Sequence, residues 1–378
     1  MASSAEDHHH HQPQTPYGST VAPPSTPTTQ ADRLSTSHAA DALSRLIHRL
    51  PPTLSLPTRL APPKTSPPIV SFSSQNLPYE IRSSSSKLSF FQLTNHSIPS
   101  QLAFSAEIES LSLFNLPPDK KQQFFPRNWP LGFDEDEEDD GDGNSTVSLC
   151  LSADCPTKST ELDLPSLTEF SRAMEKVGLE IIEALSRAVG FENPLRSRED
   201  EDKKSESRPW SSLVWISEGV AGNKPVFNGR FYPYIVALQY QIRCRKYSLL
   251  ADSGWVSVSP QVDSVLVTIG DIAQVWSNGK LKKVRGTAVA SLGDEDKSRC
   301  ISMSLLVTLP LESSISPVLP LAITVDGEDD NRTKADNENE VQSCDQKRVF
   351  QSFSLEDYAW RVYNERLLFK DPLDRYRT

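Results

Sequence analysis

From about Pro209 to Val307, apolar residues recur at every second position in short runs separated by turn residues. Asp252-Ser253-Gly254 and Ser277-Asn278-Gly279 have the composition of tight hairpin turns. Many short strands at even spacing predict a sandwich or jelly roll, so the chain is expected to be mainly β with flanking helices. The predicted strands are 212–216, 230–232, 236–242, 247–250, 255–258, 265–269, 273–276, 284–289 and 301–307.

Two helices are predicted to flank these strands. Ser166-x-x-Glu169 resembles a capping box, and a long apolar stripe follows it until Gly190. Ser354-x-x-Asp357 is expected to start a final helix that runs through Leu367. The stripe of the long helix has three- and four-residue spacing, which is typical of packing against a sheet, and consists of Phe170, Met174, Val177, Ile181, Leu185 and Ala188.

Upstream of the long helix, the pattern predicts two short strands at 68–72 and 88–93. A helix is expected to start near Ser100 and to end before Pro117-Pro118. Its core-facing residues are predicted to be Leu102, Ile108, Leu111 and Phe114.

Residues 1–65 are rich in Pro, Ser, Thr and His and poor in large apolar residues. Such a segment buries too little surface to offset its ordering entropy, so a disordered tail with one short amphipathic helix at 39–50 is predicted. The rest is divided into an N-terminal part, 66–205, and a jelly-roll part, 206–378.

The formal net charge is −11, which disfavours nucleic acid and anionic membranes as partners. No apolar run is long enough for a membrane span. The acid residues concentrate in two predicted loops, 134–144 and 326–340, which are interpreted as solvated segments. The alternative is that they dock a protein partner with a basic surface or form a weak cation site; the protein itself is expected to be a monomer.

Five cysteines without a CxxC pair favour a reducing compartment, and a cytoplasmic location is predicted. The Ser/Thr-rich N-terminus leaves a chloroplast transit peptide as the alternative.

Three segments resemble the plant iron(II)- and 2-oxoglutarate-dependent dioxygenases, the group that includes gibberellin oxidases and shares the isopenicillin N synthase-like fold. They are Phe90–Pro99, Leu116–Lys121 and Ser257–Gly279, the last with a Gly270-Asp271 turn and the letters WSNG. The resemblance implies a double-stranded β-helix, with iron(II) and 2-oxoglutarate as the family's cofactors.

In that family, iron is held by two histidines and one carboxylate. His96 is the last histidine of this chain, and it lies in a landmark outside this ligand set. The resemblance places Gly286 at the position of the distal histidine, and the segment 234–247 holds no His-x-Asp. No catalytic residue, metal ligand or bound cofactor is therefore expected, and His96 is interpreted as a satisfied residue at a helix entry.

The family clasps the 2-oxoglutarate carboxylate with an Arg-x-Ser pair. Arg299 and Ser302 are the nearest match here, with one residue too many between them. Because a one-residue shift turns a strand side chain to the other face, only a vestigial anchor of Tyr232, Arg299 and Ser302 is predicted.

Three functions fit this sequence. The favoured one is a non-catalytic, dioxygenase-like binding or regulatory module. The second is an active oxidoreductase that acts on a plant small molecule through non-standard metal ligands, drawn from Asp252, Asp263, Asp271, Cys244 or Cys300. The third is the product of a decaying gene, which the intact hydrophobic periods and turns argue against.

Overall fold

The computed structural model describes residues 64–136, 146–154, 162–196, 208–219, 232–243, 246–251, 254–291, 300–318, 348–365 and 371–378. The predicted disordered tail, the helix at 39–50 and the acidic segment 326–340 lie outside these residues. The tail prediction reached two residues too far, because Lys64–Thr65 already form strand β1, which pairs with Ser257 and Val258.

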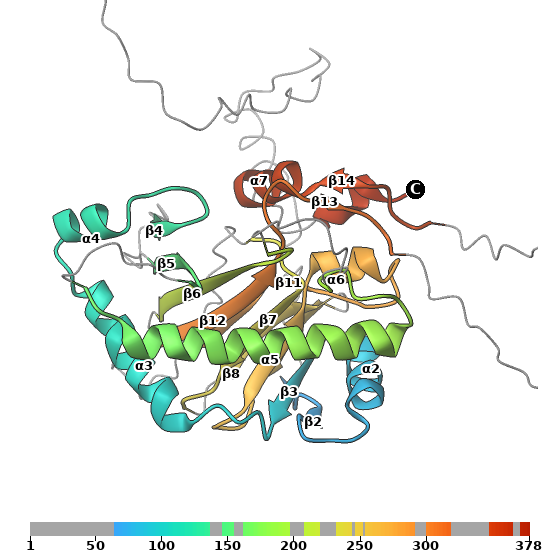
Figure 1. Cartoon of the computed structure of the whole chain (residues 1–378), viewed down its shortest axis with the longest axis horizontal. Helices are drawn as coiled ribbons and strands as arrows, with labels where there is room; N and C mark the ends of the chain where they lie inside the picture. The colour runs from blue at the N-terminus through green and yellow to red at the C-terminus, as the bar shows by residue number, and fades with distance from the viewer. Residues whose placement is uncertain are drawn as a thin grey trace, which may run out of the picture. The chain divides into compact units, whose positions relative to one another are not determined.

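A large sheet dominates the fold, in the order β2-β3-β10-β7-β12-β6-β5-β4 (Figure 1). It takes strands from both sides of the predicted boundary at 205/206, so the two parts share one sheet. The bounds are β2 Ile69–Ser71, β3 Phe90–Thr94, β4 Gly132–Asp136, β5 Thr146–Ser152, β6 Ser211–Gly219, β7 Val236–Tyr240, β10 Val265–Ile269 and β12 Cys300–Thr308.

A smaller sheet of four strands faces the large one, in the order β1-β9-β8-β11. It comprises β1, β8 Lys246–Ala251, β9 Gly254–Val258 and β11 Val284–Ser291. β8 and β9 form the predicted antiparallel hairpin, with Ala251 opposite Gly254. Two facing sheets with flanking helices confirm the predicted jelly roll.

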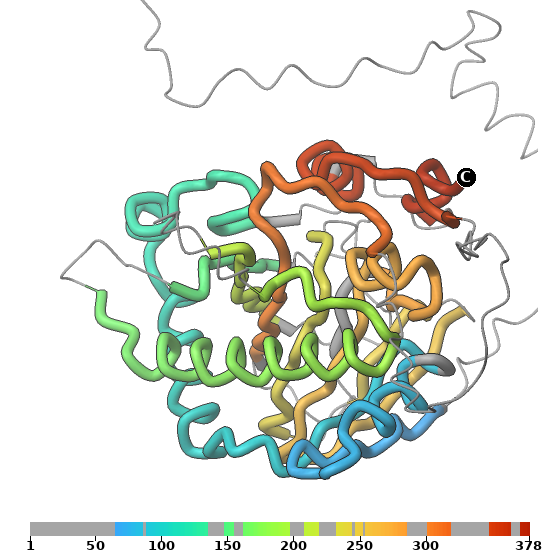
Figure 2. The backbone as a smooth tube through the Cα atoms, turned by 45° about the vertical axis from the view of Figure 1, so that its right-hand side comes forward, coloured from blue at the N-terminus to red at the C-terminus, as the bar shows by residue number. Residues whose placement is uncertain are grey.

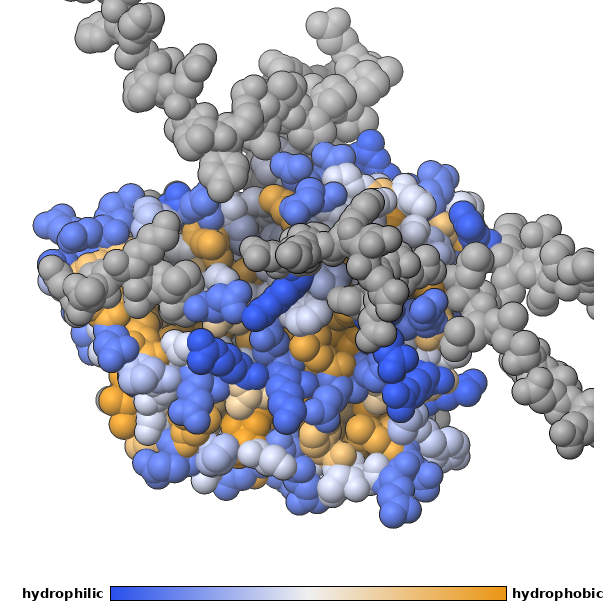
Figure 3. All heavy atoms as spheres, in the orientation of Figure 1, coloured by the Kyte–Doolittle hydropathy of each residue, from blue (hydrophilic) through white to orange (hydrophobic). Residues whose placement is uncertain are grey.

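Helix α5, Pro165–Val189, crosses the outer face of the large sheet (Figures 1 and 2). Its predicted stripe is buried throughout, which confirms that these residues pack on the core. Gly178 lies where the helix comes nearest to the strands: a Cβ there would be 2.8 Å from Cγ2 of Val307 and 3.2 Å from Cδ1 of Leu238. Hydrophilic residues cover much of this face of the molecule, with apolar patches between them (Figure 3).

The predicted capping box at the start of α5 is wrong. The helix begins at Pro165, so its N-cap is Leu164 rather than Ser166, and no side chain of the N-cap residue caps it. Instead the carboxylate of Glu109 accepts hydrogen bonds from the backbone N–H groups of Ser166, at 3.1 Å, and Leu167, at 2.8 Å. A carboxylate satisfies free N–H groups and opposes the positive end of the helix dipole, so a distant residue replaces the local cap.

Glu109 belongs to α3, Ser100–Phe114, which lies close to the predicted helix bounds. Phe114 faces the core as predicted, but Ile108 is 56% exposed, so that core assignment is wrong. α4, Pro118–Phe124, follows the two prolines, with proline in its first turn where no N–H is required.

The predicted strand at 273–276 is a helix. α6, Asp271–Trp276, starts directly after Gly270, whose added Cβ would lie 2.1 Å from the carbonyl oxygen of Tyr234. Only glycine tolerates this approach, and the chain turns there into a helix instead of extending. Ser277-Asn278-Gly279 therefore ends a helix rather than forming a hairpin: Asn278 and Gly279 have φ of 51° and 83°.

Two further features were not predicted. α2, Leu77–Leu88, is a helix in a serine-rich stretch where only the neighbouring strands were expected. The start of the acidic segment is also ordered, because Asp134–Asp136 lie in β4, at the edge of the large sheet. Acidic residues on an edge strand discourage pairing with another chain, and residues 137–145 lie outside the described part.

The C-terminal segment covers one end of the two sheets (Figure 2). It contains β13 Ser314–Ile315, β14 Phe353–Ser354, α7 Leu355–Glu365 and the 3₁₀ helix η1 Pro372–Tyr376. Ser354 accepts a hydrogen bond from the N–H of Asp357, which confirms the predicted start of α7; residues 366–370 lie outside the description. In the described part of the chain, no helix has the length and apolar character needed to cross a membrane.

The contact at Gly178 yields a prediction. Gly178→Val should lower the free energy of unfolding by about 1–3 kcal/mol, because the new side chain overlaps Val307 and pushes α5 off the sheet. Glu180→Val, on the exposed side of the same helix, is the control for helix propensity and should change stability little. Denaturant unfolding of both variants checks this, and equal effects would contradict the packing argument.

Candidate functional site

The inner face of the large sheet is the candidate site. The outer face is covered by helices: Leu238 and Val307 lie under α5, and the Ser110 hydroxyl of α3 bonds the sulfur of Met303. Because side chains alternate along a strand, Gln239, Ser302 and Ser304 lie on the opposite face, toward the small sheet. Leu266 and Phe90 on that face share a cluster with residues of the small sheet, which confirms this orientation.

Strand register arranges the inner residues in a row. Leu266 of β10 pairs with Gln239 of β7, Gln239 with Ser304 of β12, and Ser304 with Trp215 of β6. Trp215 pairs in turn with Cys150 of β5. The row therefore crosses five strands and has an apolar end, a polar middle and an aromatic end, without a charged side chain.

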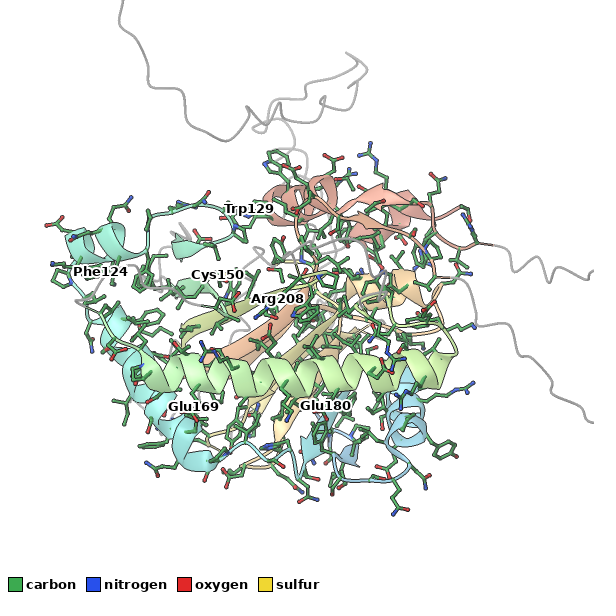
Figure 4. All side chains as sticks on the ribbon, viewed as in Figure 1. Phe124, Trp129, Cys150, Glu169, Glu180 and Arg208 are labelled. Atoms are coloured by element: carbon green, nitrogen blue, oxygen red, sulfur yellow. The ribbon has the colours of Figure 1, made fainter. Side chains whose placement is uncertain are left out.

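A small cavity of about 20 Å³ lies at the aromatic end of this row. Its floor is Ser148, Cys150 and Trp215 of the sheet. Its other walls come from the 127–134 segment, which includes Trp129, and from Tyr363 of α7. Figure 4 shows Trp129 and Cys150 on this side of the molecule. Burial raises the pKa of the Cys150 thiol, so this cysteine is an inert, protonated wall residue.

An ion pair closes the rim of the cavity. Nη2 of Arg127 donates to Oδ1 of Asp134 at 3.0 Å, and the hydroxyl of Tyr363 donates to Oδ2 at 3.1 Å. The first residue of the acidic segment is thus tied to the C-terminal helix, and its charge is neutralised beside the cavity.

Tyr232, the first of the predicted anchor residues, is 4% exposed and lies just before β7 rather than in the predicted strand 230–232. Its ring centroid is 5.8 Å from that of Trp129, which in turn contacts Tyr363. Burial raises the pKa of Tyr232, and the negative charges of Glu312 and Glu356 raise it further. The residue is therefore a neutral phenol beside the aromatic end of the row.

The structure does not bring Tyr232 and Ser302 together. The carbonyl of Pro233 accepts a bond from the Thr308 hydroxyl, so Tyr232 lies at the far end of β12 from Ser302. Six residues of a strand span about 20 Å, which is too far for both to clasp one carboxylate. Ser302 is half-buried on the inner face, beside Ser217 of β6, and Arg299 lies outside the described residues.

Neither Gly286, which the resemblance places at the distal histidine, nor His96, which lies outside the family's ligand set, offers a free metal ligand. Gly286 lies in β11 where its pairing with β8 is irregular, between Arg285 and Val289. His96 is buried: its Nδ1 accepts from the N–H of Ile98 at 3.2 Å, and its Nε2 faces the carbonyl of Asp263 at 3.0 Å. His96 is thus a satisfied residue at a helix entry, as predicted.

The donor set can be compared with the family's iron ligands. Among the described residues, no three His, Cys, Asp or Glu side chains are placed to hold an ion together. The carboxylate of Asp263 accepts from the Tyr240 hydroxyl, and Oδ1 of Asp271 is held by Lys283 and Tyr358. These donors do not fit a site with two imidazoles and one carboxylate.

A buried charge cluster near Gly286 was missed by the sequence analysis. Lys283 is fully buried, and its ammonium donates to Asp271 and, at 2.6 Å, to Asp371. The Tyr358 hydroxyl donates to Asp271 at 2.9 Å. Burial opposes ionisation of Asp371, but the charge and hydrogen bonds of Lys283 outweigh it, and the pKa of Asp371 is lowered. The cluster joins α6, β11, α7 and η1, residues too distant in sequence for any local pattern to predict.

A second, open cleft of about 480 Å³ lies beside α5. Glu175 accepts there from Trp210 at 3.2 Å and from Ser212 at 2.7 Å, and Arg208 reaches Asp154 at 3.3 Å. Figure 4 shows Arg208 above α5. Since these charged groups satisfy one another, the cleft offers a ligand little that is unpaired.

The fold and the comparisons agree on the class. Residues 235–306 match the 2OG-Fe(II) oxygenase superfamily, and the chain has the fold of that class. The solved structure of JOX2 in complex with 2OG, Fe and JA superimposes with a TM-score of 0.58 over 86% of this chain and 94% of that one, at 16% identity. The dioxygenase for auxin oxidation in rice gives 0.56 over 83% and 100%, also at 16% identity.

Relatives found by sequence include plant gibberellin dioxygenases and a flavonoid demethylase. Gibberellin 2-beta-dioxygenase 1 of Arabidopsis thaliana is 23% identical over 320 residues, which cover 79% of this chain and 89% of that protein. Oxoglutarate-dependent flavonoid 7-O-demethylase 1 of Ocimum basilicum is 22% identical over 241 residues, which cover 60% and 63%.

The charge cluster gives a stability prediction. Lys283→Met should lower the free energy of unfolding by about 3–5 kcal/mol, because it leaves two buried carboxylates without their cation. Lys282→Met, one residue away and exposed, should change it little. Urea unfolding of the two variants makes the comparison, and a loss below 1 kcal/mol for Lys283→Met would contradict a buried ion cluster.

His96 gives a pH prediction. Burial lowers its pKa, although the carbonyl and charge of Asp263 act in the opposite direction. As the pH falls below about 6.5, His96 becomes protonated in the unfolded chain but stays neutral in the folded protein. The free energy of unfolding therefore falls. Between pH 7.5 and 5.5 the wild type should lose up to about 1.4 kcal/mol more than His96→Gln. Parallel curves for the two proteins would show that His96 titrates normally in the fold.

Proposed function

We propose that this protein is a non-catalytic, dioxygenase-like module that binds a small molecule between its two sheets. It uses the fold of the 2OG oxygenases without their iron ligands and without iron or 2-oxoglutarate as bound cofactors. Its role is binding or regulation rather than oxidation.

The observation that carries the proposal is the absence of imidazole from the jelly roll. No histidine follows His96, and the stretch from Val220 to Ala251 contains no His, Asp or Glu. This stretch includes the whole connection between β6 and β7, and its only potential metal ligand is Cys244. The two ring nitrogens of His96 are both occupied by backbone groups, so His96 is not available as a replacement.

The retained inner face supports a binding role. A protein that had lost both catalysis and binding would be free to fill this face with apolar side chains, which stabilise a core more than polar ones do. Gln239, Gln241 and Ser304 instead remain polar while buried. Polar groups that are kept in a core despite their cost are typical of functional sites.

The alternative is an active oxidoreductase with non-standard metal ligands. The homologues favour it, because the relatives found by sequence are dioxygenases and demethylases that act on small molecules. Of the substitutes considered in the sequence, Asp263 and Asp271 already have partners. Cys244 and Asp252 lie outside the described residues, as does the side chain of Cys300. The alternative therefore requires these three residues as the metal ligands.

Metal and cosubstrate binding test the proposal. Purified full-length protein supplied with iron(II) without oxygen should hold less than one-tenth equivalent after the His8–His11 run is replaced by serines. Calorimetry with 2-oxoglutarate should give millimolar affinity or none, since one charge-assisted clasp contributes only about 1.5–3 kcal/mol. Stoichiometric iron, or micromolar 2-oxoglutarate binding that Arg299→Ala abolishes, would refute the proposal in favour of the active enzyme.

A further inference from the structure

The buried cluster around Lys283 contains a carboxylate oxygen that has no partner. Oδ1 of Asp271 accepts hydrogen bonds from the ammonium of Lys283 and from the hydroxyl of Tyr358, whereas Oδ2 of the same carboxyl group is buried without a hydrogen bond. The three residues come from α6, the residue before β11, and α7, at the upper end of the sheets in Figure 1. Buried polar atoms are almost always hydrogen-bonded in folded proteins, so this oxygen requires an explanation.

We propose that Lys283 and Asp271 condense in the folded chain to an intramolecular amide, an isopeptide bond. Nζ of Lys283 attacks Cγ of Asp271, the bond between Cγ and Oδ2 breaks, and Oδ2 leaves as water. The ammonium gives up two protons and both end on Oδ2, so no oxidant, reductant or further reactant is required. The oxygen without a partner is the atom that the reaction removes. The proposal does not depend on the proposed binding function.

The reacting atoms are already in position. A nitrogen that is hydrogen-bonded to a carboxylate oxygen lies within about 3.5 Å of the carboxyl carbon, the separation of a near-attack geometry. The side chains of Lys283 and Asp271 are 1% and 3% exposed, so neither can turn away into solvent. Groups held in this way react as if they were extremely concentrated. A condensation that fails in dilute solution can therefore proceed inside the fold.

Two neighbours are placed to assist the reaction. The hydroxyl of Tyr358 donates to Oδ1 of Asp271 at 2.9 Å, and this oxygen becomes negative when Nζ adds to Cγ, so the hydroxyl stabilises the charge that develops. Oδ1 of Asp371 accepts from Nζ at 2.6 Å and can carry the protons from the nitrogen to Oδ2. Burial opposes ionisation of Asp371, but Lys283 lowers its pKa, so this carboxylate is an ionised proton acceptor.

Asp371 itself is less suited as the acceptor of the amine. Its Oδ1 also accepts from the N–H of Leu373 at 3.0 Å, and its Oδ2 lies 4.0 Å from Nη2 of Arg285. A carboxylate that is stabilised as an anion on both oxygens resists attack by a nucleophile. Asp271 has the hydroxyl donor on one oxygen and the unpaired second oxygen.

Burial also favours the product. The amide replaces an ammonium and a carboxylate that are costly to hold in a protein interior, and its N–H remains a donor for Asp371. Hydrolysis needs water, which the closed packing around Lys283 and Asp271 keeps away. The amide would join the first residue of α6 to the residue before β11.

Mass spectrometry of the full-length protein, unfolded in guanidinium before the measurement, tests for the bond. Most chains should weigh one water less than the sequence requires. Trypsin does not cleave after an acylated lysine, so the digest should contain peptide 247–280 joined to peptide 283–285. Fragmentation of this joined peptide locates the amide.

Four variants assign the atoms. Lys283→Met removes the amine and should restore the full mass, whereas Lys282→Met, at its exposed neighbour, should keep the loss. Asp271→Asn has ammonia as its leaving group, so the loss should change from one water to one ammonia. Tyr358→Phe keeps the ring and removes the donor, so the linked fraction at a fixed short time after synthesis should fall about tenfold or more.

The full sequence mass in folded wild-type protein would overturn the proposal, and so would an amide between Lys283 and Asp371. A water loss that persists in Lys283→Met would also overturn it, because the loss would then come from succinimide formation at an Asp-Gly pair such as Asp140-Gly141. Equal linkage in Tyr358→Phe would reject the assigned geometry. Tyr358→Phe and Asp271→Asn nearly preserve side-chain shape, so they keep the test decisive if Lys283→Met does not fold.

Discussion

The close approach of α5 to the large sheet at Gly178 determines which face of the sheet is covered by helices and which faces the small sheet. Because Gly178 has no side chain, α5 packs directly on the side chains of β7 and β12: an added Cβ would lie 2.8 Å from Cγ2 of Val307 and 3.2 Å from Cδ1 of Leu238. This contact fixes one face of β7 and β12 as outer, and by alternation their other face must look toward the small sheet. The placement of Gln239 and Ser304 on the inner face follows from the packing of Leu238 and Val307 on the outer one.

At one end of the two sheets, the buried cluster around Lys283 holds the C-terminal segment in place. A lysine with no exposed surface is tolerable only because two carboxylates neutralise it, and a third group, the Tyr358 hydroxyl, completes the shell. The C-terminal segment is thereby tied to α6 and to the start of β11. The ion pairs of Lys283 with Asp271 and Asp371 fix the start of β11, the strand that contains Gly286. The resemblance places a metal ligand of the family at Gly286.

Much of the fold could be read from the sequence, and the failures share a cause. The stripe from Phe170 to Ala188 and the β8–β9 hairpin depend on neighbours in sequence, and both were predicted. The Glu109 cap, the helix at Asp271–Trp276 and the charge pair of Lys283 depend on residues brought together only by folding. Ile108 failed for the same reason, since periodicity cannot say which side of α3 meets the sheet.

The prediction of the candidate site followed the resemblance rather than the geometry. Tyr232 and Ser302 match family landmarks, yet Tyr232 follows on from the Thr308 end of β12 and Ser302 lies near its other end. Gln239 matches no landmark of the family. In the sequence it is one polar residue in a strand that alternates apolar and polar residues, so nothing local distinguishes it. Only its burial and its unpaired atoms distinguish it, and neither can be seen before the strands are assembled. In a fold whose inherited chemistry depends on absent histidines, the informative residues are those whose cost the present structure leaves unexplained.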